Sequence, residues 1–361
     1  MIVRELNPNL YEAIYDWYRQ LPSDVNAIEL GNTRDNLKNS KQAIIACLVE
    51  QFPRSYRESY ELYCDLFDNL EIFTIYDNLD CINVLALGTG SGGDVFGLIH
   101  AFEDYYCEKQ INIYTVEGNA DALLSQVNIF RSYIDPNLIK NEVNIIPISI
   151  VINSNFYSLK QKLNQLSQKR EIKKFDLIQS FKWMNEQSVR EKIRFYDLYL
   201  FINAYLLPNR VSVLAEYSNP LSPFKCDHSV SKRALNEYYV YCQRNGIHNQ
   251  LCALTPTPCV ARRLTGLSQK QCRGCKGCFQ EVKAYVKFSE QTSYAWQSSC
   301  LFSMKLASGE LGQHLTKSLQ DDTVGYQTSV RVGPVSEMFC TLNATVSEEK
   351  RGNAFKLSQQ E

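Results

Sequence analysis

The segment CINVLALGTGSGGDVFGLIHAF, residues 81–102, constrains the fold of this chain more than any other. It opens with a continuous apolar run, continues through Gly88, Gly90, Gly92 and Gly93, and ends in an apolar stretch with helical spacing. Glycine permits positive φ in such a turn and lets a ligand come close to the backbone. The segment therefore predicts a buried strand, a glycine loop and a helix that begins near Gly93.

Further strands are expected at 111–116, 142–150, 175–181 and 211–216, with helices between them, including a polar one at about 156–170. Strands that alternate with helices at this spacing predict βαβ units and a parallel sheet covered on both faces. Apolar runs at 282–288 and 293–306 predict an antiparallel hairpin at the end of that sheet.

The expected organisation begins with a helical region, residues 1–80, in which Pro53 separates two helices because proline cannot continue the hydrogen-bond ladder. A Rossmann-like core follows at 81–217, a basic cysteine-rich segment at 218–281, the terminal hairpin at 282–342 and a polar tail at 343–361. The fold class is therefore α/β, with a metal-binding insertion before the last hairpin.

Glu117 closes the next expected strand, 24 residues after Gly93, where it can accept hydrogen bonds from ribose hydroxyls. This combination suits a dinucleotide or S-adenosylmethionine. A third interpretation is a Rossmann-type sheet that has kept no cofactor. The adjacent glycines Gly92 and Gly93 give a wide loop that favours the methyl donor, and the element order resembles class I methyltransferases. Such enzymes usually carry an acid two residues before the first glycine, where this chain has Ala86. The expected cofactor-binding residues are Gly88, Thr89, Gly90, Gly92, Gly93, Glu117 and Ser180.

The net charge of −1 conceals an asymmetry. Residues 1–150 carry 10 Lys and Arg against 22 Asp and Glu, whereas 225–287 carry 11 against three. A local excess of +8 is typical of a surface that meets phosphates, although it also fits a solvated basic face. We expect Arg262, Arg263, Arg273 and Lys276 to contact RNA.

The sequence contains no run of about 18 apolar residues, so we expect no membrane span. Its start, MIVRELNPNLYEAIYDWY, lacks the character of a signal or transit peptide. We therefore expect an intracellular, cytoplasmic protein, or one of the mitochondrial matrix if a presequence was trimmed.

Thirteen cysteines are an odd number, which disfavours a disulfide scaffold. Cys259, Cys272, Cys275 and Cys278 give the spacing C-x12-C-x2-C-x2-C, with Cys252 as an alternative fourth ligand. Four thiolates suit tetrahedral Zn²⁺, and the same run resembles the ligation of a 4Fe–4S cluster. The spacing predicts a metal site and leaves its metal open.

The segment KQAIIACLVEQFPRSYRESYELYCDL resembles the helical lead-in of the small-ribosomal-subunit methyltransferase-like family, whose members include a mitochondrial ribosome-assembly protein. SFKWMNE, LTPTPCVAR and CKGCFQEVKAYVKF resemble later segments of that family, in order, across roughly residues 40–305. The chain departs from the family at two places. It has Gln51 before Phe-Pro where the family has Arg, and it has Gly277 and Phe279 beside the late cysteine where the family often has His. The resemblance implies an S-adenosylmethionine-binding fold with a 4Fe–4S cluster that acts on, or assembles with, the small ribosomal subunit.

The leading functional hypothesis is a methyltransferase, or methyltransferase-like factor, that acts on RNA. The alternatives are a small-molecule methyltransferase with a structural zinc site and an inactive RNA-binding assembly factor. Asn185 and Glu186 are weak catalytic candidates because they are the polar groups well placed beyond the fourth strand, and a helix cap explains them equally well. The sequence names no catalytic base.

Overall fold

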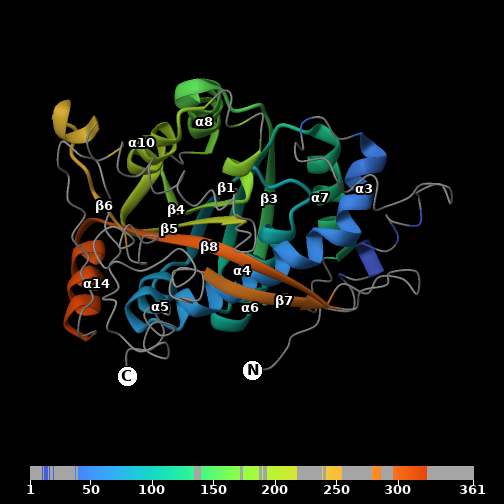
Figure 1. The fold of residues 1–361 in the computed structure, drawn as a ribbon, viewed down its shortest axis with the longest axis horizontal. Coiled ribbons are helices and arrows are strands. Elements are labelled where there is room, and N and C mark those ends of the chain that lie inside the picture. The colour runs from blue at the N-terminus through green and yellow to red at the C-terminus, as the bar shows by residue number, and fades with distance from the viewer. Residues whose placement is uncertain are drawn as a thin grey trace, which may run out of the picture.

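The strand, loop and helix predicted at residues 81–102 are present, with β1 at Cys81–Leu87 and α6 at Gly93–Tyr105. This computed structural model describes residues 10, 12–14, 16, 19, 37, 40–133, 140–170, 174–186, 189, 193–217, 238, 241–253, 279–285 and 296–322. Figure 1 shows a central sheet with helices packed on both of its faces.

Eight strands form one sheet in the order β3-β2-β1-β4-β5-β8-β6, and β7 also pairs with β8. The strands after β1 are β2 (Gln110–Glu117), β3 (Glu142–Ser149), β4 (Phe175–Phe181), β5 (Leu206–Tyr217), β6 (Leu251–Ala253), β7 (Phe279–Tyr285) and β8 (Trp296–Ser308). The pairs from β3 to β5 are parallel, and β8 runs antiparallel to β5. This Rossmann-like α/β sheet, closed by an antiparallel hairpin, confirms the predicted class I methyltransferase fold.

The outer edge of β8 carries two separate strands. β6 pairs with residues 306–308 of β8, and β7 pairs with residues 296–302. The chain therefore leaves this edge at Ala253, opposite Leu306, and returns at Phe279, opposite Phe302. At about 3.4 Å per strand residue, the two points lie on the order of 14 Å apart. The intervening residues, 254–278, are outside the described part of the chain.

The helices divide between the two faces of the sheet. They are α3 (Lys41–Glu50), α4 (Phe52–Phe67), α5 (Leu70–Asp77), α7 (Ala120–Tyr133), α8 (Tyr157–Arg170), α10 (Phe195–Tyr205) and α14 (Gly309–Asp322). One apolar core packs α4, α5, α6 and α7 against the sheet, and a second packs α8 and α10 against the opposite face. In Figure 1, α8 and α10 lie on one side of the strands and α4, α5 and α6 on the other.

The helical lead-in is present as predicted from residue 41 onward, with Pro53 in the first turn of α4. α4 packs tightly on α6 because α6 carries glycine where the two backbones meet. A Cβ on Gly97 would stand 2.3 Å from the carbonyl oxygen of Tyr56, and one on Gly93 would stand 2.5 Å from that of Phe52. α4 is thus fixed beside the start of α6, at the end of the glycine loop.

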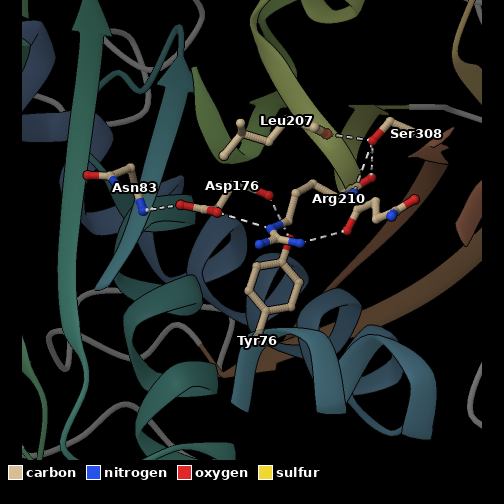
Figure 2. A network of polar contacts seen from close by, with 7 residues as sticks. Tyr76, Asn83, Asp176, Leu207, Arg210 and Ser308 are labelled. Atoms are coloured by element: carbon tan, nitrogen blue, oxygen red, sulfur yellow. Dashed lines mark hydrogen bonds and ion pairs between the residues drawn. The ribbon is translucent and has the colours of Figure 1, made fainter. Parts of the chain in front are cut away.

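A buried polar network ties the strands together near the start of β4 (Figure 2). The Asp176 carboxylate accepts hydrogen bonds from the Arg210 guanidinium at 3.0 Å and from the backbone N–H of Asn83 at 2.9 Å. The hydroxyl of Tyr76 donates to the backbone carbonyl of Asp176, and Ser308 bonds the backbone of β5. The network joins β1, β4, β5, β8 and α5.

Two elements were not expected from the sequence. β6 falls inside the predicted cysteine-rich segment, where its three residues give no recognisable period. α14 follows the hairpin, and only two of its residues, Leu311 and Leu315, are buried hydrophobics in its described first half. The polar tail predicted at 343–361 lies outside the described residues.

Candidate cofactor-binding and active site

The glycine loop lies at the carboxyl end of β1, between the ends of β2 and β4. Gly88, Gly90 and Gly92 all have positive φ, at 65°, 52° and 92°, a conformation that other residues rarely adopt. Because β1 pairs with β2 on one side and β4 on the other, the strand order reverses here. Open α/β sheets bind ligands in the crevice at such a reversal.

Glu117, the last residue of β2, holds the loop in place. Its carboxylate accepts the backbone N–H of Gly90 at 2.8 Å through Oε2 and that of Asn119 at 2.8 Å through Oε1. The residue is only 5% exposed. Glu117 therefore sets the shape of the loop, a role that the spacing argument for a ribose ligand did not include.

Gly88 is required by the packing of the protein, independently of any ligand. A Cβ at this position would stand 2.3 Å from two indole carbons of Trp183. Trp183 belongs to a short 3-10 helix, η3 (Trp183–Asn185), directly after β4, and it is 7% exposed. The indole thus covers the loop from the β4 side.

A shallow hollow that opens to solvent and encloses only about 20 Å³ lies where the loop meets the ends of β2, β3 and β4. Most of its lining is apolar, and its polar side chains include two carboxylates, Glu117 and Glu186. The lining residues are Leu37, Gly88, Val116, Glu117, Gly118, Ile150, Val151, Ile152, Trp183, Glu186 and Val189. A narrow apolar space with one aromatic wall and carboxylate acceptors suits a flat ligand that carries hydrogen-bond donors.

The predicted cofactor residues gather at this edge of the sheet, although they do not all line the hollow. Gly88 and Glu117 line it. Thr89 is buried behind the loop and donates to the side-chain oxygen of Gln126 at 3.2 Å. Ser180 is fully buried within β4, and its hydroxyl has no hydrogen-bond partner among the described residues.

The two weak catalytic candidates follow Trp183. Glu186 lines the hollow, and its backbone N–H donates to the carbonyl of Trp183 at 3.1 Å, at the end of η3. Asn185 is the last residue of η3. Its side chain is outside the described part of the chain.

A polar cluster that the sequence analysis missed lies beside the loop, between α4, α6 and β4. We define it as Ser55, Glu58, Asp94, Gln179 and Lys182. Lys182 forms an ion pair with Glu58 and contacts the Ser55 hydroxyl at 3.2 Å. Gln179 donates to the Asp94 carboxylate at 2.8 Å. Glu58 is 0% exposed and Asp94 3%, so both carboxyl groups are deeply buried.

Burial raises the pKa of Asp94 to about 7, against an ordinary value of 3.8. Hydrogen bonds from the first backbone N–H groups of α6, the charge of Lys182 and the Gln179 amide oppose this shift. Gln179 is oriented in turn by Tyr63, whose hydroxyl donates to its side-chain oxygen at 2.7 Å. The sequence signal was a lysine directly after an apolar strand, in FDLIQSFK, together with charged residues inside an aromatic-rich helix.

The predicted metal ligands Cys259, Cys272, Cys275 and Cys278 lie outside the described residues, as do Arg262, Arg263, Arg273 and Lys276. The alternative ligand Cys252 is in β6, and burial raises the pKa of its thiol. Within the described ranges, no three His, Cys, Asp or Glu side chains come together as a metal site.

None of the helices in those same ranges combines the length and apolarity needed to cross a membrane.

No protein-family model and no curated protein sequence matches this chain. Solved structures do. The plantazolicin methyltransferase BamL, in complex with a desmethylplantazolicin analogue and SAH, is 10% identical with a TM-score of 0.40, over 82% of this chain and 99% of that one. Fibrillarin from Aeropyrum pernix, with natively bound S-adenosyl-L-methionine, is 12% identical with a TM-score of 0.32, over 69% and 76%. The fold assignment rests on the strand order and not on these distant similarities.

Proposed function

We propose that the chain is an S-adenosylmethionine-dependent methyltransferase that binds its cofactor in the hollow. The observation that carries the proposal is the left-handed glycine loop at the strand-order reversal, held by Glu117 and bordered by the hollow. When bound, the cofactor supplies an electrophilic methyl group.

The residues of the hollow fit the adenosine part of this cofactor. Each oxygen of an ionised carboxylate has two acceptor sites, so Glu117 can accept ribose hydroxyls while it keeps the loop N–H bonds. Trp183 supplies an aromatic side chain to the lining for contact with the purine, and the residues that follow β3 supply aliphatic ones. Glu186 can accept the exocyclic amine of adenine. This binding role is compatible with the place of Glu186 in the lining.

Gly90→Val should abolish binding of S-adenosylhomocysteine in calorimetry, because a branched side chain strains the left-handed loop and fills the ligand's approach. The matched control is Gly246→Val. Gly246 has a similar φ of 62°, but a Cβ there meets nothing within 4 Å. The control variant should strain the backbone equally and bind normally. Tight binding of NAD by the wild type, with no response to S-adenosylmethionine or S-adenosylhomocysteine, would contradict the proposal.

We further propose that the methyl acceptor is RNA, of or associated with the small ribosomal subunit, and that the cysteines of residues 254–278 hold a 4Fe–4S cluster. Support comes from the +8 charge of 225–287 and from the cysteine spacing. The topology adds that residues 254–278 leave and rejoin one edge of β8 at nearby points, so a metal centre can form there without disturbing the sheet. A small-molecule methyltransferase with one zinc is the alternative.

Anaerobically purified protein is expected to be brown and to contain about four irons per chain. Cys275→Ser should lose the iron and RNA binding while it still binds S-adenosylhomocysteine. Cys107→Ser, at an exposed free cysteine, should change neither and serves as the control. Metal analysis and absorption spectra decide the outcome. A colourless protein with one zinc would contradict the cluster, and a folded metal-free protein would contradict any metal.

A further inference from the structure

Lys182 directly follows β4, at the point where the strand order reverses. Ser180 of that strand is paired with Leu87 of β1, and Gly88 is the first residue after β1. The two strands therefore end side by side at the strand-order reversal. A side chain held here is close to any ligand that binds on the glycine loop.

We propose that Lys182 accepts the proton that leaves the methyl acceptor, with Glu58 as the residue that positions its amine. The inference rests on the proposed function and names a base that the sequence did not reveal. Its support is the backbone of Lys182, the contacts of its amine and the charges around it.

The backbone of Lys182 is held in a conformation that lysine disfavours. Its φ and ψ are 61° and 2°, and its N–H donates to the carbonyl of Ala215 in β5 at 2.6 Å. A left-handed conformation costs a residue other than glycine about 1–2 kcal/mol, and such residues concentrate at functional sites. Glycine or asparagine would take this place at lower cost, so the lysine side chain is what the position requires.

The amine is held by two side chains of α4, and part of the lysine side chain reaches solvent. It pairs with Glu58, which is 0% exposed, and lies 3.2 Å from the Ser55 hydroxyl, while 24% of the Lys182 side chain remains exposed. Ser55 itself adjoins the loop, because a Cβ on Gly93 would stand 3.0 Å from the Ser55 Cβ. The amine therefore lies near the end of the glycine loop, on a side chain that is partly exposed.

The surrounding charges suit a group that gains and loses a proton. Burial lowers the pKa of Lys182, and the nearby Arg54 lowers it further, whereas Glu58 and Asp94 raise it. The net effect is a lowered pKa for Lys182, so the neutral amine is populated at lower pH than in an ordinary lysine. When the amine gains a proton, the resulting ammonium is stabilised by Glu58.

The bonds and the proton of the methyl transfer can be accounted for with the groups named above. A nitrogen or oxygen of the acceptor forms a bond to the methyl carbon, and the carbon–sulfur bond breaks with its electron pair kept by sulfur. The acceptor's proton moves to the neutral amine of Lys182, which becomes an ammonium ion. The ammonium ion then releases this proton to solvent.

Trace acetylation of the full-length protein with acetic anhydride tests the assignment, because this reagent reacts with neutral amines. Mass spectrometry gives the labelling rate of each lysine across a pH series. Lys182 should label with a lower pH midpoint than Lys162, an exposed lysine of α8. Glu58→Gln should lower the midpoint of Lys182 further, because it removes a carboxylate that raises the pKa. At about ten times its Kd, S-adenosylhomocysteine should slow Lys182 labelling about tenfold and leave Lys162 unaffected.

Calorimetry on the same samples separates two kinds of failure. If S-adenosylhomocysteine binds but Lys182 titrates with Lys162 and is not protected, Lys182 is not the base and the proposed function stands. A purely structural ammonium, permanently paired with Glu58, would instead label with a midpoint above that of Lys162, and that result would also overturn the assignment. If S-adenosylhomocysteine does not bind, the proposed function fails and the assignment of Lys182 fails with it.

Discussion

Asp176→Ala is expected to lower the free energy of unfolding by about 3–5 kcal/mol, the usual cost of removing one partner from a buried ion pair. The substitution leaves the Arg210 guanidinium without its carboxylate, and Arg210 has only 17% of its side chain exposed. It also removes the acceptor for the backbone N–H of Asn83. Urea unfolding followed by circular dichroism measures the loss.

A surface ion pair provides the control for this variant. Asp16 pairs with Arg19 at 3.4 Å, and their side chains are 66% and 60% exposed. Pairs of this kind contribute at most about 1 kcal/mol, so Asp16→Ala should change stability by no more than that. A loss at Asp176 no larger than the loss at Asp16 would mean that the network in Figure 2 does not hold the strands together.

Asp94→Asn should stabilise the protein at neutral pH and not at acidic pH. The folded chain keeps a proton on Asp94 up to about pH 7, whereas the unfolded chain releases it near the ordinary value of 3.8. Between these values the folded state binds more protons, so wild-type stability falls as pH rises through this window. At about 1.4 kcal/mol per pKa unit, the penalty reaches on the order of 4 kcal/mol above pH 7. An asparagine avoids it and still accepts the hydrogen bond from Gln179.

Urea unfolding at a series of pH values from 4 to 8 gives the free energy of unfolding as a function of pH. In Asp94→Asn this free energy should fall less steeply with rising pH than in the wild type. Asp121→Asn is the matched control, because Asp121 also lies in the first turn of a helix, α7, but reaches solvent. The Asp121 variant should keep the wild-type slope. Equal slopes for wild type and Asp94→Asn would show that Asp94 is already ionised in the folded protein.

Much of the fold could be predicted from the sequence because its strong signals are local. The strand at 175–181 is buried at every position and that at 81–87 at five of seven. Both are largely apolar and bounded by turn residues, so their composition and length identify them as central strands. β6 and α14 were missed for the opposite reason. β6 has three residues and exists because β8 is long enough to pair with two strands on one edge. α14 shows few apolar residues, and its place is set by contacts with β5 and β8.

The site divides in the same way. The glycines and Glu117 were found because backbone conformation and spacing leave a mark on the sequence. The Lys182–Glu58 pair joins residues 124 positions apart, and nothing local to either residue indicates the other. The sequence analysis assigned no role to Trp183, and its contact with Gly88 and its place in the lining of the hollow come from the structure alone.

The two-strand edge of β8 also has an evolutionary consequence. Because residues 254–278 depart from and return to neighbouring points on one edge, the sheet places little demand on their number or identity. Insertions, deletions and replacements in this segment can accumulate without changing the pairing of β5 with β8, so the segment can diverge faster than the strands that anchor it. Changes at this edge can therefore accumulate while the glycine loop after β1 stays as it is.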